Sequence, residues 1–272
     1  MENYLLCGEL QSQEEGVSAW PTPVSLVYKG RRKGSVQFVG IGKYDKQDKK
    51  YIENGVQLMH SLDHENVLKF SEWYETPQHI WVITELAIGG TLSHILHQDG
   101  CIPSPNIHDF VRDIAAGLTY IHSRGVLYCD LQPSKIVLDG RQLLKLSDFT
   151  LAQTMADCHN HYNLTSLVNT LLTPSGKDHP LKYAPSPFYA APELFVDGGQ
   201  FSTASDLWSL GCIVYELSLG CKPFDSNDPD LLLQSISCIQ PNAVVQSPET
   251  AQLLSNLLTG EPSHRTTPPQ YT

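Results

Sequence analysis

The chain has 272 residues, 41% of them hydrophobic, a composition typical of a globular protein with one large or two modest folding units. Its net charge of −11, with only 18 lysines and arginines, argues against binding to nucleic acid. The sequence has no apolar run of about 18 residues and no secretory signal, and its seven cysteines lack a C-x-x-C pair or zinc spacing, so we expect a cytoplasmic protein with free thiols and no membrane contact.

The first 86 residues predict a small twisted antiparallel sheet with one helix. Segments rich in β-branched and aromatic residues predict strands near 4–10, 24–30, 36–44, 67–75 and 79–87. One helix is expected at 49–62, weakened by Asn54 and Gly55 at its centre. The N-terminal part of the chain is therefore predicted to be mostly β.

The residues after 86 predict a larger, mainly helical part. Apolar residues at three- and four-residue steps predict a helix over 104–122 that ends near Gly125, and they are Ile107, Val111, Ile114, Leu118 and Ile121. The segment 205–220 is apolar on nearly all sides, which predicts a buried helix. Short strands at 135–140 and 143–149 flank a turn at Gly140. The predicted fold class is therefore α+β.

A long polar segment between Asp148 and Pro192 contains only short apolar runs. A loop of this length inside a compact domain is usually functional or disordered. The sequence stops at RTTPPQYT without a predicted final helix, so we expect the chain to be a piece of a longer protein.

Three short motifs follow the β-rich part in order: CDLQPSK at 129–135, SDF at 147–149 and APE at 191–193. Each motif is weak alone, but their order and spacing resemble the protein kinase family over essentially the whole chain. The segments SLDHENVLKFSEWYE and ITELAIGGTL also resemble the helix-to-strand corner and the hinge of kinases. Within that family, VYKGRRKG, EWYET, SDLWSLGC and the lysine of the first motif are most similar to the Unc-51-like, Fused and Runkel group.

The resemblance implies a bilobal kinase-like domain over 1–272, with an N-lobe at 1–86, a C-lobe at 87–272 and an activation segment at 148–193. It also implies a buried ion pair between Glu193 and Arg265, and hydrogen bonds from the catalytic-loop backbone to Asp206. A hydrophobic column between the lobes would run through Met59, Tyr128 and Phe149.

The N-lobe departs from the kinase pattern at its phosphate-binding positions. Residues 10–28 contain one glycine, two glutamates and two prolines where kinases have a glycine-rich flap, so we do not expect a phosphate cradle. The strand lysine that holds the α and β phosphates is replaced by Gly42. Lys43 would point to the opposite face of the strand unless a bulge intervenes, and Lys46 would have to reach back. Gly55 stands where the glutamate of the kinase helix is expected, nine residues before His64.

The catalytic loop retains Asp130, which accepts the substrate proton in kinases, but has Lys135 in place of the metal-binding asparagine. The D-F-G motif becomes Asp148-Phe149-Thr150, so one metal-binding carboxylate is kept. A lysine at position 135 would repel magnesium and attract phosphate, and we therefore predict no metal site. Two alternatives stay open: Asp130 could serve only to hold backbone amides, and Lys135 could be an ordinary surface lysine.

The resemblance also implies which residues contact a nucleotide. Val27, Gly40 and Val137 would enclose an adenine base, and Thr84, Glu85 and Ala87 would form the hinge beside it. The phosphate-facing candidates are Lys43, Lys46, Lys135 and Asp148.

Three classes of function are consistent with these residues. The leading one is a pseudokinase that binds ATP weakly and without magnesium, with Lys135 and a lysine of the third strand on the phosphates and Asp148 paired to one of them. The second is an active, ATP-dependent serine/threonine kinase with a displaced lysine, and the third is a structural domain that binds no nucleotide. Members of the similar branch are regarded as pseudokinases tied to cilia and microtubules. The resemblance therefore implies protein partners in a ciliary or microtubule complex, and a location in the cytoplasm, cilium or microtubule cytoskeleton.

Overall fold

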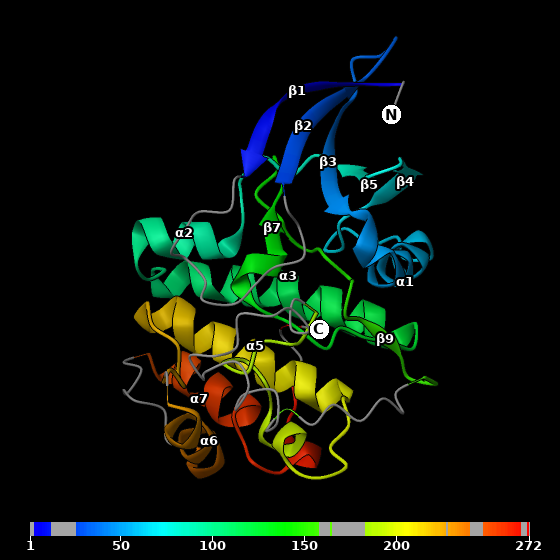
Figure 1. Cartoon of the computed structure of the whole chain (residues 1–272). Coiled ribbons are helices and arrows are strands. Elements are labelled where there is room, and N and C mark those ends of the chain that lie inside the picture. The colour runs from blue at the N-terminus through cyan, green and yellow to red at the C-terminus, as the bar shows by residue number, and fades with distance from the viewer. Residues whose placement is uncertain are drawn as a thin grey trace.

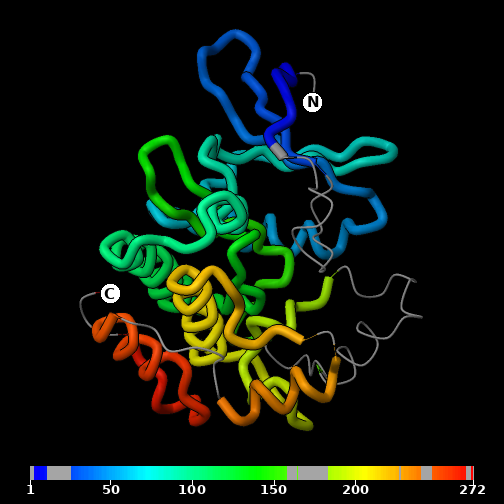
Figure 2. The backbone as a smooth tube through the Cα atoms, turned by 90° about the vertical axis from the view of Figure 1, so that its left-hand side faces the viewer, coloured from blue at the N-terminus to red at the C-terminus, as the bar shows by residue number. Residues whose placement is uncertain are grey.

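The computed structural model describes residues 3–11, 26–157, 164, 183–226, 228–239, 247–267 and 271. These residues form a small β-rich part above a larger helical part (Figure 1), which confirms the predicted α+β fold class. Figure 2 shows the same two parts from the side, with the blue N-terminal strands at the top and the yellow-to-red helices at the bottom.

The upper part is a five-stranded antiparallel sheet with the strand order β1-β2-β3-β5-β4. Its strands lie close to the predicted segments, and they are β1 (Tyr4–Gln11), β2 (Leu26–Arg32), β3 (Phe38–Asp45), β4 (Phe70–Glu75) and β5 (His79–Glu85). The 3-10 turn η1 (Lys46–Asp48) leads from β3 into helix α1 (Lys49–His60). Ile52 and Val56 of α1 pack against Tyr44, Ile80 and Val82 on one face of the sheet.

The lower part is built from helices around one large core. The helices are α2 (Leu92–Asp99), α3 (Ser104–Ser123), α5 (Thr203–Leu219), α6 (Pro229–Cys238) and α7 (Pro248–Leu257), with 3-10 turns η3 (Pro192–Phe195) and η4 (Pro262–His264). The predicted apolar stripe of α3 is buried, and so are most residues of α5, as expected. Helix α3 ends just before Gly125, whose positive φ of 75° suits a residue without a side chain.

Short strands between α3 and the activation segment carry the loops of the predicted site. Strand β6 (Val126–Leu127) pairs with β9 (Gln153–Thr154), and β7 (Ile136–Leu138) pairs with β8 (Leu144–Leu146). The turn η2 (Pro133–Lys135) precedes β7. The segment between β5 and α2 joins the two parts of the molecule.

The two C-lobe contacts implied by the resemblance are present. The Arg265 guanidinium binds the Glu193 carboxylate through two parallel bonds of 2.6 and 2.8 Å, and it lies 5.0 Å from the ring centre of Trp208. Asp206 accepts hydrogen bonds from the backbone N–H groups of Tyr128 and Cys129, each 2.9 Å long. These contacts fix the catalytic loop to α5 and fasten the end of the activation segment.

The predictions about cysteines, membrane spans and long loops concern residues of which the structure describes a part. Cysteines within the described residues are free thiols, as predicted. No described helix is both long enough and apolar enough to span a bilayer. Residues 12–25 of the predicted flap, and 158–163 and 165–182 of the predicted activation segment, lie outside the described residues.

Candidate functional site at the junction of the two lobes

Lys135 lies between the two aspartates of the kinase motifs. Its Nζ atom is 2.6 Å from Oδ2 of Asp130 and 3.3 Å from Oδ2 of Asp148. The side chains are almost fully buried, with exposed fractions of 3% for Lys135, 4% for Asp130 and 9% for Asp148. The interpretation of Lys135 as a surface lysine is therefore wrong, and a pairing of Asp148 with a lysine is present.

Local backbone geometry brings these three side chains together. Ile136 of β7 pairs with Leu146 of β8, so the residues just outside that pair, Lys135 and Ser147, are also neighbours. The Ser147 backbone N–H and hydroxyl both donate to the Lys135 carbonyl, at 2.9 and 2.8 Å. Asp148 follows with a positive φ of 52°, a left-handed conformation that aspartate tolerates better than most residues.

Asp130 is held by one donor from its own loop and one from the activation segment. Nε2 of Gln132 lies 3.1 Å from each carboxylate oxygen, and the backbone N–H of Ser186 donates to Oδ1 at 2.8 Å. Burial raises the pKa of Asp130 by more than the neighbouring Lys135 charge and the Ser186 amide lower it. Both oxygens of this carboxylate already accept hydrogen bonds, so a substrate hydroxyl would have to displace one of these donors.

Asp148 is held in a similar way by the residue that replaces the glycine of the D-F-G motif. The Thr150 hydroxyl donates to Oδ1 of Asp148 at 2.7 Å, and the Thr150 backbone N–H lies 3.3 Å from the same atom. With Lys135 on Oδ2, each oxygen of the carboxylate has a donor. The described residues contain no cluster of three or more histidine, cysteine, aspartate or glutamate side chains arranged for a metal ion. Because Lys135 stands in place of the metal-binding asparagine and both Asp148 oxygens already have donors, these residues do not fit the magnesium site of kinases.

The charges of this cluster do not cancel. One ammonium faces two carboxylates, which leaves a net negative charge where a kinase holds its metal-bound phosphates. Burial lowers the pKa of Lys135, but the charges of Asp130 and Asp148 outweigh burial and raise it overall. Lys135 therefore keeps its proton at neutral pH.

The third strand does not supply a lysine to this cluster. Strand β3 pairs with β2 and β5 without a bulge, so Gly42 and Tyr44 share one face and Lys43 points to the other. The Lys43 ammonium lies 5.9 Å from the ring centre of Trp81. The structure thus agrees with the strand-parity argument, and the prediction of Lys43 as a phosphate-facing residue is wrong.

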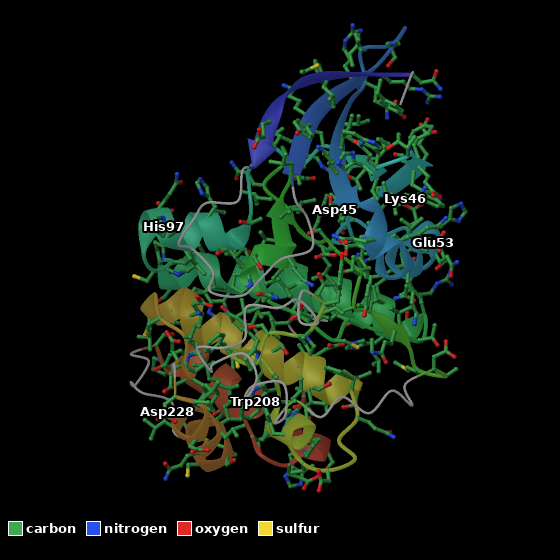
Figure 3. The ribbon with its side chains drawn as sticks, in the orientation of Figure 1. Asp45, Lys46, Glu53, His97, Trp208 and Asp228 are labelled. Atoms are coloured by element: carbon green, nitrogen blue, oxygen red, sulfur yellow. The ribbon has the colours of Figure 1, made fainter. Side chains whose placement is uncertain are left out.

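The Lys46 side chain also points away from the cluster of Lys135, Asp130 and Asp148. The prediction that Lys46 contacts the phosphates is therefore wrong. Its Nζ atom lies 2.9 Å from Oε1 of Glu75 on β4, and 45% of its side chain is exposed. Figure 3 shows Lys46 and Glu53 on the same side of the molecule, around α1. The chain turns into η1 immediately after β3, so the alternation of the strand no longer fixes the direction of this side chain.

Tyr44 occupies the space in which a lysine at position 42 would begin. A side-chain carbon on Gly42 would lie 2.9 Å from Cε2 and 3.3 Å from the hydroxyl oxygen of Tyr44. Burial, and then the charge of Asp148, raise the pKa of Tyr44, so its hydroxyl stays protonated. The sequence analysis did not identify Tyr44, although its position two residues after Gly42 places both on one strand face.

Helix α1 contributes no carboxylate to the site. Gly55 is buried, and Glu53 lies on the outer side, 3.6 Å from Lys49. Nδ2 of Asn54 donates to the carbonyl of Ala152 at 2.9 Å. The Tyr51 ring stacks on Tyr183 at 4.0 Å with an interplanar angle of 2°. Helix α1 is thus attached to both ends of the activation segment.

The adenine end of the cleft retains the predicted arrangement of backbone. Gly40 of β3 pairs with Thr84 of β5, and a side-chain carbon on Gly40 would lie 2.9 Å from the Thr84 hydroxyl. Val27 of β2 pairs with Gly42 and so shares its face, and Val137 lies on β7. The roles of these residues in ligand binding remain predictions.

The Glu85 side chain at the hinge joins a network that sequence reasoning missed. Lys145, with an exposed side-chain fraction of only 3%, lies 3.0 Å from Oε1 of Glu85 and 3.9 Å from Asp139. The same Glu85 oxygen accepts the Lys69 backbone N–H at 2.8 Å. A lysine in the centre of the short apolar strand LLKLSDF was the one available signal, because a buried lysine requires a carboxylate partner.

Comparison with known proteins agrees with this geometry. The family model described as "Protein kinase domain" matches residues 23–272. The chain belongs to the protein kinase family. This kinase domain is 38% identical over 244 residues to serine/threonine-protein kinase RUNKEL of Arabidopsis thaliana, covering 89% of the chain and 16% of that protein. It is 36% identical over 278 residues to serine/threonine-protein kinase ULK4 of Mus musculus, covering 97% of the chain and 21% of that protein.

A further relative is also a serine/threonine-protein kinase. Serine/threonine-protein kinase 36 of Pongo abelii is 32% identical over 248 residues, covering 88% of the kinase domain and 17% of that protein. The chain thus spans about a fifth or less of the length of these relatives. Together these similarities support the Unc-51-like, Fused and Runkel group recognised from the sequence.

The kinase domain also keeps the hydrophobic column between its lobes. Met59, Tyr128 and Phe149 are buried in one core cluster, and the rings of Tyr128 and Phe149 meet edge to face at 5.2 Å. The Tyr128 hydroxyl donates to the carbonyl of Ser147, immediately before Asp148. Tyr128, in place of the histidine of the kinase motif, therefore holds the start of the activation segment by both packing and hydrogen bonding.

Proposed function

We propose that this kinase domain is a pseudokinase, which transfers no phosphoryl group and acts as a protein-interaction module. The observation that carries the proposal is the position of Lys135, 2.6 Å from Asp130 and 3.3 Å from Asp148. Phosphoryl transfer depends on positive charge arranged around the transferred group and on a free carboxylate beside the acceptor. In this domain the ammonium group of Lys135 is paired with both carboxylates, so its charge is not available to a phosphate.

The other phosphate-binding groups support the same proposal. Gly42 replaces the strand lysine, Gly55 replaces the helix glutamate, and Lys43 and Lys46 have partners away from the cluster. Removing one such electrostatic contact typically lowers kcat by about a hundredfold to a thousandfold. The loss of several together supports a role that depends on the shape of the domain.

ATP is proposed as a weak ligand that binds without magnesium. Val27, Gly40 and Val137 would enclose its base, and hinge groups at Thr84, Glu85 and Ala87 would orient it. Lys135 and Asp148 would lie at the phosphate end without a metal. Most of the affinity would then come from the base.

The proposed partners are proteins of a ciliary or microtubule complex, in the cytoplasm, cilium or microtubule cytoskeleton. This part rests only on resemblance to the Unc-51-like, Fused and Runkel group. It is tested by co-sedimentation of the purified chain with polymerised tubulin. Recovery of the chain in the supernatant at every tubulin concentration would contradict direct binding to microtubules.

Catalysis and nucleotide binding are tested separately. We expect no transfer of labelled γ-phosphate from ATP to the protein or to a generic basic substrate, in magnesium or manganese. Transfer that disappears in Asp130→Asn would instead support the active-kinase alternative. In thermal-shift measurements, ATP should stabilise the domain in a chelator, and magnesium should not increase the shift. A shift that appears only with magnesium would contradict a metal-independent site.

A further inference from the structure

The hinge offers polar backbone groups that none of the described residues binds. Within the described residues, no hydrogen bond involves the N–H or C=O group of Ala87 at the hinge. The chain on its C-terminal side is fixed, because Gly89 N–H donates to the Leu138 carbonyl at 2.9 Å and Leu138 N–H donates to the Gly90 carbonyl at 3.0 Å. Ala87 is half-buried. Its N–H donor and C=O acceptor are therefore available to a ligand at a rigid position that is partly shielded from water.

The opposite end of the cleft is negative. Lys135 is shared by Asp130 and Asp148, so one carboxylate has no cation of its own. A phosphate placed there would approach more negative than positive charge in a poorly hydrated environment.

Among the described residues, the nearby lysines add no positive charge at this cluster. Lys46 and Lys49 both bind Glu75, at 2.9 and 2.7 Å, on the outer side of α1 and β4. Lys43 lies over Trp81 on the other face of β3. The space above Gly42 is taken by the Tyr44 ring, whose hydroxyl carries no positive charge.

We propose that the cleft selects an uncharged purine nucleoside, or a similar neutral heterocycle, over its phosphorylated forms. The inference rests on the proposed binding of a base at the hinge and deepens it by naming the ligand class. The base binds the free groups of Ala87 between Val27 and Val137, and each added phosphate weakens binding because it approaches the Asp130–Lys135–Asp148 cluster.

The test is a titration of the whole chain with adenosine, AMP, ADP and ATP in a chelator, by calorimetry and thermal shift. The expected result is that affinity falls along this series, with adenosine binding at least tenfold more tightly than ATP. ATP binding more tightly than adenosine would overturn this inference and leave the proposed ATP binding intact. Absence of binding by all four ligands would instead contradict the proposed nucleotide site itself, and this inference with it.

A variant tests whether charge is the cause. Asp148→Asn removes the surplus negative charge, and it should reduce the ratio of adenosine to ATP affinity at least threefold. Asp63→Asn removes the same charge from an exposed side chain that pairs with Lys69, and it should leave the ratio unchanged. An unchanged ratio in Asp148→Asn would overturn the charge argument. The ligand series in the wild-type chain remains decisive if Asp148→Asn does not fold.

Discussion

Gly55 of α1 lies directly against the backbone of Phe149. A side-chain carbon at position 55 would stand 3.1 Å from the carbonyl carbon and oxygen of Phe149, and 3.1 Å from the backbone nitrogen of Thr150. The family resemblance expects a glutamate at this position. Helix α1 therefore lies so close to the start of the activation segment that a side chain at position 55 would require the backbone to shift by a few tenths of an ångström.

Restoring that glutamate should destabilise the domain. Gly55→Glu gains at most about 1 kcal/mol of helix propensity, but overpacking against a rigid backbone typically costs about 1–3 kcal/mol, and a charge would be buried as well. We expect the melting temperature to fall by several degrees. Gln57→Glu adds the same charge on the exposed face of α1 and should change it little. A Gly55→Glu variant as stable as the wild type would show that α1 can move away freely.

Removal of the shared cation should destabilise the fold in a pH-dependent way. Lys135→Met leaves two buried carboxylates without their ammonium, which typically costs about 3–5 kcal/mol. Without that charge the pKa of folded Asp130 rises further, so the variant loses stability as the pH rises through this pKa. Urea denaturation should therefore show a deficit that is largest near pH 7 and smaller near pH 5. A deficit equal at both values would mean that the lysine acts by packing alone.

Glu216 provides a second pH-dependent test at a site remote from the cleft. Burial raises its pKa by more than the hydrogen bond from the Tyr189 hydroxyl, 2.7 Å long, lowers it. A raised folded pKa contributes stability at low pH that is lost as the pH rises through that value. Glu216→Gln keeps an acceptor for Tyr189 without the charge. Relative to wild type, it should gain stability between pH 4 and pH 7, by at most about 1.4 kcal/mol per pH unit. A pH-independent difference in denaturation free energy would contradict this account.

The stacked pair Tyr51 and Tyr183 should stabilise the contact between α1 and the activation segment. Tyr51→Ala removes a ring 4.0 Å from its partner, and aromatic pairs contribute about 0.5–1.5 kcal/mol beyond the area that they bury. We expect faster amide hydrogen exchange near Tyr183 and Ala152 in this variant. Tyr51→Phe keeps the ring and should exchange like the wild type. Equal exchange in the alanine variant would show that the stack does not hold the segment.

A metal response should be recoverable by two substitutions. Lys135→Asn supplies an amide oxygen where kinases have one, and Thr150→Gly frees Oδ1 of Asp148 from its hydroxyl donor. With both changes, magnesium should raise the melting temperature in the presence of ATP. Thr150→Gly alone keeps the lysine on Asp148 and should show no such response. If the double variant is also indifferent to magnesium, other residues exclude the ion.

Many helices and strands of the fold could be predicted from sequence patterns, because each pattern lies within one short segment. The α3 stripe and the alternating strands encode the faces that they bury, and strand parity alone indicated that Lys43 would point away from the cleft. The Glu193–Arg265 pair and the contacts of Asp206 required the family resemblance, because their partners are far apart in the chain. Helices α2, α6 and α7 were expected only as part of a helical region, since each has ten residues or fewer and shows little periodicity.

The site was less predictable, because its geometry depends on contacts between distant segments. Lys46 binds Glu75 on another strand, and no local pattern indicates that partner. A contact between Lys135 and Asp148 was predicted from the sequence. The second and shorter contact, between Lys135 and Asp130, depends on the path of two loops and could not be predicted. Ser186 reaches Asp130 from 56 positions away, so its role could not be read from spacing.

The Tyr44 ring opposes the single substitution Gly42→Lys, which would restore a lysine to strand β3. A lysine at position 42 would have its first side-chain carbon 2.9 Å from the Tyr44 ring, and a glutamate at position 55 would meet the backbone of Phe149. Reversion at either position is thus opposed by a close neighbour. A return toward the catalytic pattern would therefore need coordinated changes in β3 and α1, a barrier of the kind called an evolutionary ratchet.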